Sequence, residues 1–158
     1  MKDKHKQAYM KICDVNAELS ECLRNKFGAV IVDPDGNTIL AAGYNGYIRG
    51  GPTHCGGEDV CLRETIGIKS GTQFEIGCIH AEENAITNAG RQGVSTVGKW
   101  LFVNGEPCRL CARRIVQSGI IKVIFRESGY DNNGIKILEE CGIEMETMEA
   151  DGCQYLVL

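Results

Sequence analysis

The sequence predicts an α/β fold in which a β-hairpin joins a parallel half-sheet. A β-branched run at 27–32 is followed by a strong turn signal at 34–37 and a second apolar run, which indicates a hairpin. From residue 99 onward, apolar strand patterns alternate with helical patterns, which implies parallel strands connected by helices. The 158 residues match the size of one domain, so we expect a single domain over 1–158.

Local patterns place each element along the chain. Apolar residues at helical spacings alternate with short β-branched or aromatic runs, and Gly119 marks the end of one helix. We predict helices over 5–25, 79–89, 108–118 and 134–141, and strands over 27–32, 38–42, 99–104, 121–125 and 143–148. The segment 43–79 holds nine glycines and three cysteines. A loop this long is usually functional or tied down, so we expect an insert at about 47–79.

Composition and charge exclude several classes of protein. The hydrophobic fraction of 43% and the charged fraction of 24% are those of a globular domain. No run approaches the roughly 20 apolar residues of a membrane span, and the N-terminal residues lack the pattern of a secretion signal. A net charge of −4 with 6% aromatic residues disfavours nucleic acid and anionic membranes as partners. We therefore expect a cytoplasmic protein.

The nine cysteines stand out in this composition. They make up about 6% of the chain, below the roughly 8–10% of a disulfide scaffold, and their number is odd. In a reducing compartment, clustered cysteines indicate metal or catalytic sites.

Four residues predict a catalytic zinc site. Cys108 and Cys111 lie three apart at a strand-to-helix junction, where both sulfurs can reach one ion and the helix start favours thiolate. His80 opens another predicted helix and can be the third ligand. Three protein ligands leave one position on zinc for water, which is typical of a catalytic site. Glu82 follows the histidine closely enough to act as the proton shuttle.

Either half of this pattern would be weak alone. A lone Cys-x-x-Cys is as often a redox pair, and a structural zinc site would need a fourth fixed ligand. The order His-x-Glu followed by Pro-Cys-x-x-Cys matches the known zinc-deaminase signature.

With these motifs, the chain resembles the cytidine/deoxycytidylate deaminase superfamily, and within it the deoxycytidylate (dCMP) deaminase subgroup. The likeness spans roughly residues 9–145. It is carried by FGAVIV at 27–32, AGYNG at 42–46, His54-Cys55 with CLRE at 61–64 and Ser70-Gly71, HAEENAI at 80–86, PCRLCA at 107–112, and QSGI at 117–120 with Tyr130-Asp131.

The resemblance implies a three-layer α/β/α fold with a five-stranded mixed sheet. It also implies hydrolytic deamination of a cytosine nucleotide, dCMP to dUMP plus ammonia, which supplies a dTTP precursor. Glu82 would move protons from the attacking water to the ring and the leaving ammonia. Asn45 would contact the sugar, the Ala81 backbone amide would contact the pyrimidine carbonyl, and Tyr130 would line the pocket wall. Hexamer assembly and control by dCTP and dTTP are further family properties.

Two stretches depart from the family pattern. Tyr47-Ile48-Arg49 stand where a proline is usual, and Asn104-Gly105-Glu106 replace a threonine-containing segment. Both lie where sugar or phosphate would bind, so the exact nucleotide stays open. Candidate cations for the phosphate are Arg24, Lys26, Arg49 and Arg109, among which the sequence does not choose.

Four further cysteines predict a second, structural zinc that clips the insert. Cys22, Cys55, Cys61 and Cys78 match positions that bind such a zinc in some dCMP deaminases, and a glycine-rich loop gains most from a clip. The alternative is that the four thiols are simply packed as buried apolar groups and bind no metal. If a zinc ion is bound, His54 could be a ligand in place of Cys55. Cys13, Cys141 and Cys153 receive no role.

Two other kinds of function stay open at this point. A related zinc deaminase could act on a tRNA adenosine, or on a free base or riboflavin precursor. A non-catalytic zinc-binding or nucleotide-sensing protein could share the fold. The acidic net charge disfavours tRNA, and Glu82 disfavours a sensor, which needs no proton shuttle.

Overall fold

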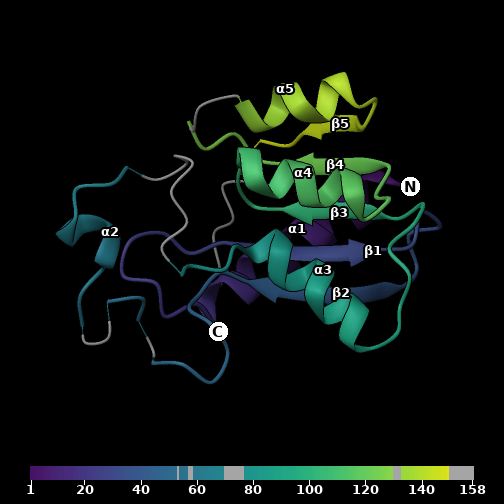
Figure 1. Ribbon diagram of the computed structural model, residues 1–158. Coiled ribbons are helices and arrows are strands. Elements are labelled where there is room, and N and C mark those ends of the chain that lie inside the picture. Colours follow the sequence, from purple (N-terminus) through teal and green to yellow (C-terminus); the bar gives the residue numbers. More distant parts are fainter. Residues whose placement is uncertain (53, 57–58, 70–76, 130–132, 150–158) are drawn as a thin grey trace.

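A five-stranded mixed sheet in the order β2-β1-β3-β4-β5 forms the centre of the protein (Figure 1). It is seen in a computed structural model that describes residues 1–52, 54–56, 59–69, 77–129 and 133–149. The strands are β1 (Gly28–Val32), β2 (Ile39–Tyr44), β3 (Trp100–Val103), β4 (Lys122–Phe125) and β5 (Glu144–Thr147). β1 is antiparallel to both β2 and β3, whereas β3, β4 and β5 run parallel. The predicted hairpin and parallel half-sheet are confirmed.

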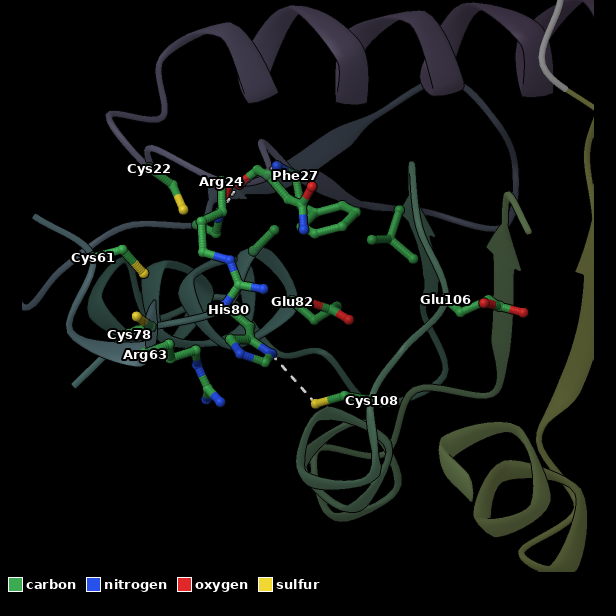
Figure 2. A pocket seen from close by; sticks show the side chains of 14 residues that line it. Cys22, Arg24, Phe27, Cys61, Arg63, Cys78, His80, Glu82, Glu106 and Cys108 are labelled. Atoms are coloured by element: carbon green, nitrogen blue, oxygen red, sulfur yellow. Dashed lines mark hydrogen bonds between the residues drawn. The ribbon is translucent and has the colours of Figure 1, made fainter. Parts of the chain in front are cut away.

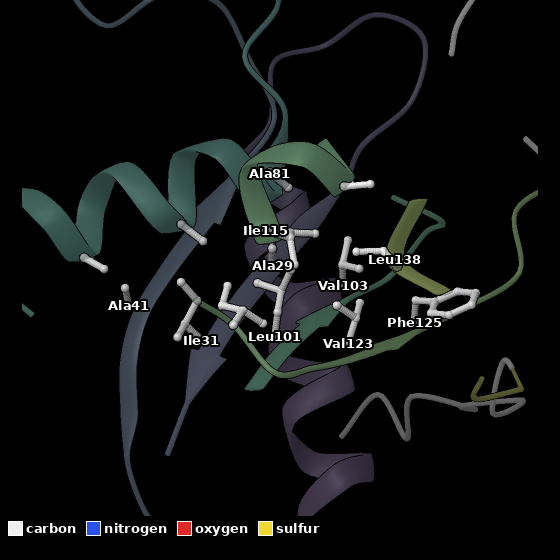
Figure 3. Close-up of a cluster of buried hydrophobic side chains, with 14 residues drawn as sticks. Ala29, Ile31, Ala41, Ala81, Leu101, Val103, Ile115, Val123, Phe125 and Leu138 are labelled. Carbon is white, nitrogen blue, oxygen red and sulfur yellow. The ribbon is translucent and has the colours of Figure 1, made fainter. Parts of the chain in front are cut away.

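Helices cover both faces of this sheet. The helices are α1 (Asp3–Glu18), α2 (Leu62–Thr65), α3 (Ala81–Arg91), α4 (Arg109–Gln117) and α5 (Asn133–Glu140). One core cluster places α1 against Val30, Val32 and other residues on one sheet face. The second cluster places α3, α4 and α5 against the opposite face, around Ile31 and Leu101 (Figure 3). The three-layer α/β/α architecture is therefore confirmed.

The residues of β1 explain its central place. All five residues of the strand are buried, because helices cover both faces. Gly28 is required at its start, since a Cβ there would overlap the Cys13 carbonyl oxygen of α1. Gly36 has a φ of 77° and makes the hairpin turn, a conformation that favours glycine.

The first predicted helix is wrong in its second half. We expected it to continue to residue 25, but α1 ends at Glu18. The Ser20 amide bonds to the Ala17 carbonyl, and the Ser20 hydroxyl accepts the Cys22 amide, so the chain turns back towards β1. β2 also extends two residues further than predicted. The short helix α2 within the insert was not predicted, because four residues carry no helical period.

Among the described residues, no helix combines the length and the apolar character needed to cross a membrane.

Two lysines fasten the outer strand β5 to the rest of the domain. The Lys122 ammonium lies 2.6 Å from a Glu144 carboxylate oxygen and 2.9 Å from one of Glu146. The Lys6 ammonium of α1 donates to Glu146 at 2.6 Å. Burial raises the pKa of Glu146, but the hydrogen bonds from Lys6 and Lys122 outweigh it and leave that pKa lowered. Ionised Glu146 therefore stabilises the folded state.

We expect Glu146→Gln to lower the free energy of unfolding at pH 7 by about 1 kcal/mol. Because the folded pKa of Glu146 is lowered, its contribution is present above the unfolded pKa and is lost as pH falls through the folded value. Urea unfolding between pH 7 and 3 measures both effects. Glu144→Gln is the matched control, since that side chain is 66% exposed. Equal losses in both variants would contradict the assignment.

Candidate metal centre and main hollow

His80, Cys108 and Cys111 meet where two helices begin. His80 is the N-cap of α3 and Cys108 is the N-cap of α4, with Cys111 in the first turn of α4. The His80 Nδ1 atom lies 3.3 Å from the Sγ atoms of both cysteines. Within the described part of the chain, this is the one set of three His, Cys, Asp or Glu donors whose ligand atoms all lie within 4.8 Å.

The donor set fits a zinc ion. Zinc binds histidine nitrogen at about 2.0–2.1 Å and cysteine sulfur at about 2.3 Å, which separates tetrahedral donors by about 3.6 Å. The observed N to S separations of 3.3 Å are within a few tenths of an ångström of this value. One imidazole and two thiols form a common catalytic zinc set, in which a fourth position is left open.

The two thiols of this set differ in their proton affinity. A hydrogen bond from Cys111 lowers the pKa of Cys108 to about 4; burial opposes this and contact with His80 supports it. The same hydrogen bond, together with burial, raises the pKa of Cys111 well above its ordinary value. Cys108 is thus ready as a thiolate, and a metal ion would displace the Cys111 proton on binding.

Glu82 lies beside these donors in the first turn of α3. Its side chain is 5% exposed, and burial raises its pKa to about 7; the charge of His80 partly opposes this shift, and that of Cys108 supports it. A carboxyl group with this pKa can accept and release a proton near neutral pH.

Close backbone packing places the two helix starts. A Cβ on Gly43 of β2 would overlap the Ala85 amide of α3, and a Cβ on Gly134 of α5 would overlap the Pro107 carbonyl oxygen. Only glycine permits these approaches. The loop before Pro107 is further held by Asn104, whose Oδ1 accepts the Gly28 amide at 2.9 Å.

Beside these donors lies a hollow that opens to solvent, called here the main hollow (Figure 2). It is lined by Cys22, Arg24, Asn25, Phe27, Asn45, Cys61, Arg63, Cys78, His80, Ala81, Glu82, Val103, Glu106 and Cys108. The predicted acid, two of the metal ligands, Asn45 and Ala81 therefore share one hollow. Tyr130 lies outside the described residues.

Asn45 has structural contacts in addition to its place in the main hollow. Its Oδ1 accepts the Phe27 amide at 2.7 Å, and its Nδ2 donates to the Asn25 carbonyl at 2.8 Å. The side chain thus holds the loop before β1 against the end of β2. Ala81 is the first residue of α3, where backbone N–H groups have no partner within the helix.

The structure separates the candidate cations. Arg24 lines the main hollow, whereas Lys26 and Arg109 do not. Arg49 lines a different hollow and donates to the Asn88 side chain at 3.0 Å. Arg63 of α2 also lines the main hollow, and our sequence reasoning missed it. The repeated triplet Cys-Leu-Arg, at 22–24 and 61–63, was a signal that could have found it.

The other four predicted cysteines gather beside the main hollow. Cys22, Cys55, Cys61 and Cys78 line a second hollow together with His54, called here the cysteine hollow. Burial raises the pKa of Cys78 to about 12, and a hydrogen bond with Cys55 acts in the same direction. No three of these sulfurs lie within 4.8 Å of one another, so their spacing is wider than at the first site. Cys13 is buried and Cys141 exposed, while Cys153 lies outside the described residues.

The fold and the His/Cys/Cys donor set define a class of protein, the zinc-binding deaminase-like α/β domains. The sequence model of the cytidine and deoxycytidylate deaminase zinc-binding region matches residues 3–127. The chain belongs to this family.

Named relatives agree with this assignment. The deoxycytidylate deaminase of Schizosaccharomyces pombe is 33% identical over 139 residues, covering 87% of this chain and 42% of the relative. That of Saccharomyces cerevisiae is 36% identical over 138 residues, covering 85% and 42%. The chain thus spans less than half the length of these two relatives. The cyanophage S-TIM5 dCMP deaminase, solved in complex with dCMP and dUMP, superimposes with a TM-score of 0.78, 33% identity and coverage of 94% and 99%.

We expect Cys108→Ser to lower the zinc content by about one ion per chain, because the substitution removes one of the three ligands. Elemental analysis of the purified protein measures this. Cys141→Ser is the control, since that cysteine is exposed and distant from the donor set in sequence. Unchanged zinc in Cys108→Ser would contradict the assignment of the ligands.

Proposed function

We propose that this chain is a zinc-dependent hydrolase that deaminates dCMP to dUMP and ammonia. The observation that carries the proposal is the buried Glu82 carboxyl group, which shares the main hollow with His80 and Cys108 of the His80, Cys108 and Cys111 donor set. The named relatives support a cytosine nucleotide as the substrate. The described strands share one sheet, which supports one domain over 1–158.

Glu82 performs the proton transfers of this reaction. A zinc ion held by His80, Cys108 and Cys111 would supply Lewis-acid activation of water. Glu82 accepts a proton from the water that adds to C4 of cytosine, and donates it to N3. It then takes the remaining hydroxyl proton and delivers it to the amino group. The C4–N4 bond breaks, and ammonia leaves as the uracil carbonyl forms.

Neighbouring groups orient the nucleotide. The Ala81 amide, at the start of α3, donates to the pyrimidine carbonyl oxygen. Asn45 contacts the sugar through the donor and acceptor capacity that its loop contacts leave available. Tyr130 is retained as a pocket-wall residue from the sequence pattern alone.

The family likeness also suggests how the enzyme is regulated, assembled and located. We propose that dCTP and dTTP control its activity and that identical subunits assemble into a hexamer. We also propose that it supplies dTTP precursors in the cytoplasm. The net charge of −4 supports a small nucleotide over a polynucleotide as the ligand.

A second zinc site at the cysteine hollow is part of the proposal. Its support is the convergence of Cys22, Cys55, Cys61 and Cys78 on one hollow, with His54 beside them. A bound ion would draw the sulfurs closer and deprotonate them. The ion would tie the loop before β1 to the insert and to the residue two before His80.

We expect wild-type protein to release ammonia from dCMP, and Glu82→Gln to lower kcat by about 100- to 10,000-fold. The amide keeps the shape of the side chain but cannot transfer the protons. A coupled ammonia assay measures the rate, and zinc analysis of the variant shows that the ion is retained. No turnover of any cytosine nucleotide by zinc-replete wild-type protein would overturn the proposed function.

We expect about two zinc ions per chain in wild-type protein, and about one in Cys61→Ser or Cys78→Ser. Elemental analysis measures the stoichiometry, and Cys141→Ser again serves as the control. One ion per chain in wild type, still lost in Cys108→Ser, would return the four cysteines to ordinary packing.

A further inference from the structure

The segment 104–106 leads from the end of β3 towards the metal donor Cys108, and it begins with an asparagine. The Asn104 backbone amide donates to the Gly28 carbonyl at 3.2 Å, and the side-chain Oδ1 accepts the Gly28 amide at 2.9 Å. The side chain thus adds one more amide group to the ladder between β3 and β1. Its Nδ2 donates to the Oδ1 atom of Asp14, on α1, at 3.2 Å.

Asp14 fixes which way round the Asn104 amide is held. A carboxylate can only accept hydrogen bonds, so it selects the Nδ2 end of the amide and leaves Oδ1 for Gly28. Asp14 is itself held by Arg126, whose Nη1 donates to the same carboxylate oxygen at 2.6 Å. Helix α1 packs on the opposite face of the sheet from α4 (Figure 1). A residue on one face therefore supports the segment that leads into the helix on the other.

The far end of the segment is tied to the loop after β4. The Glu106 carboxylate accepts the Ser128 amide at 3.2 Å and the Ser128 hydroxyl at 3.1 Å, and the Glu106 amide donates to that hydroxyl at 3.1 Å. Ser128 stands two residues after Arg126, which is bound to Asp14. The ties at Asn104 and Glu106 therefore share Asp14 as their support.

Little chain freedom separates these ties from the metal donors. Pro107 has a fixed φ, and the residue before a proline is restricted to extended backbone. Cys108 follows directly and is the N-cap of α4. A displacement of the segment therefore moves Cys108 relative to His80, whose Nδ1 lies 3.3 Å from the Cys108 Sγ.

We propose that Asp14 is a positioning residue for the metal centre, and that it sets the spacing of the zinc donors through Asn104 and Arg126. Asp14 does not line the main hollow, so it acts on the site through these two neighbours. Removing hydrogen-bond partners that orient metal ligands typically weakens metal binding by about 10- to 100-fold. The inference concerns the donor set and does not depend on the reaction proposed above.

Zinc affinity tests this inference without any nucleotide. Competition with a chromophoric chelator gives the dissociation constants, and the ion missing from Cys108→Ser identifies the first zinc site. We expect Asp14→Ala to raise the constant of that site by about 10-fold. Asp14→Asn should raise it less than about threefold, because it keeps an acceptor for Asn104 and Arg126. Glu18→Ala is the matched control, since it removes an exposed carboxylate from the same helix.

A double-mutant cycle shows whether Asp14 acts through Asn104. We expect the loss of zinc affinity in Asp14→Ala/Asn104→Ala to be smaller than the product of the two single losses, because both substitutions break the same contact. If Asn104→Ala does not fold, Asn104→Thr takes its place, since threonine keeps a hydrogen-bond acceptor but lacks the second polar group of the amide.

Thermal unfolding of each variant separates positioning from stability, and zinc affinity is measured well below every midpoint. Unchanged zinc affinity in Asp14→Ala, even with a lower midpoint, would overturn the positioning role. Independent losses in the cycle, or an equal loss in Glu18→Ala, would do the same. If wild type binds zinc with this dependence on Asp14 but releases no ammonia from dCMP, the positioning role stands and the proposed function fails.

Discussion

Two helices must begin at neighbouring points on one edge of the sheet, and the rest of the site depends on this constraint. His80 caps α3 and Cys108 caps α4, so the donors come together only when both helix starts are fixed. Gly43 lets α3 reach the β2 backbone, and Gly134 lets α5 reach the Pro107 carbonyl. Because these contacts are made by backbone atoms, they fix the backbone positions from which the donor side chains extend.

Burial affects the carboxyl group and the guanidinium groups of the main hollow in different ways. The same exclusion of water raises the pKa of Glu82 to about 7 and keeps the charge of Arg63 weakly screened. A carboxyl group of intermediate pKa moves protons, whereas a guanidinium that never loses its charge attracts an anion. The main hollow therefore brings together a carboxyl group that can exchange protons and guanidinium groups of permanent charge.

Cysteines lie both at the metal donor set and beside the arginines of the main hollow. Cys108 and Cys111 belong to the metal donors, while Cys22 and Cys61 stand two residues before the arginines that line the main hollow. Cys13 serves as a small apolar residue of the core under α1. Of the nine cysteines, two thus lie in the metal donor set, four line the cysteine hollow and Cys13 packs in the core.

The sequence alone determined the hairpin, the parallel half-sheet and the His80, Glu82, Cys108 and Cys111 pattern, because each depends on local periodicity or on short spacings near helix starts. It could not locate the end of α1, where tertiary packing overrides a continuing apolar pattern. It also could not choose among the cations. Which arginine lines the main hollow depends on how the insert folds back on the sheet, and only the tertiary structure shows that Arg24 and Arg63 both do so.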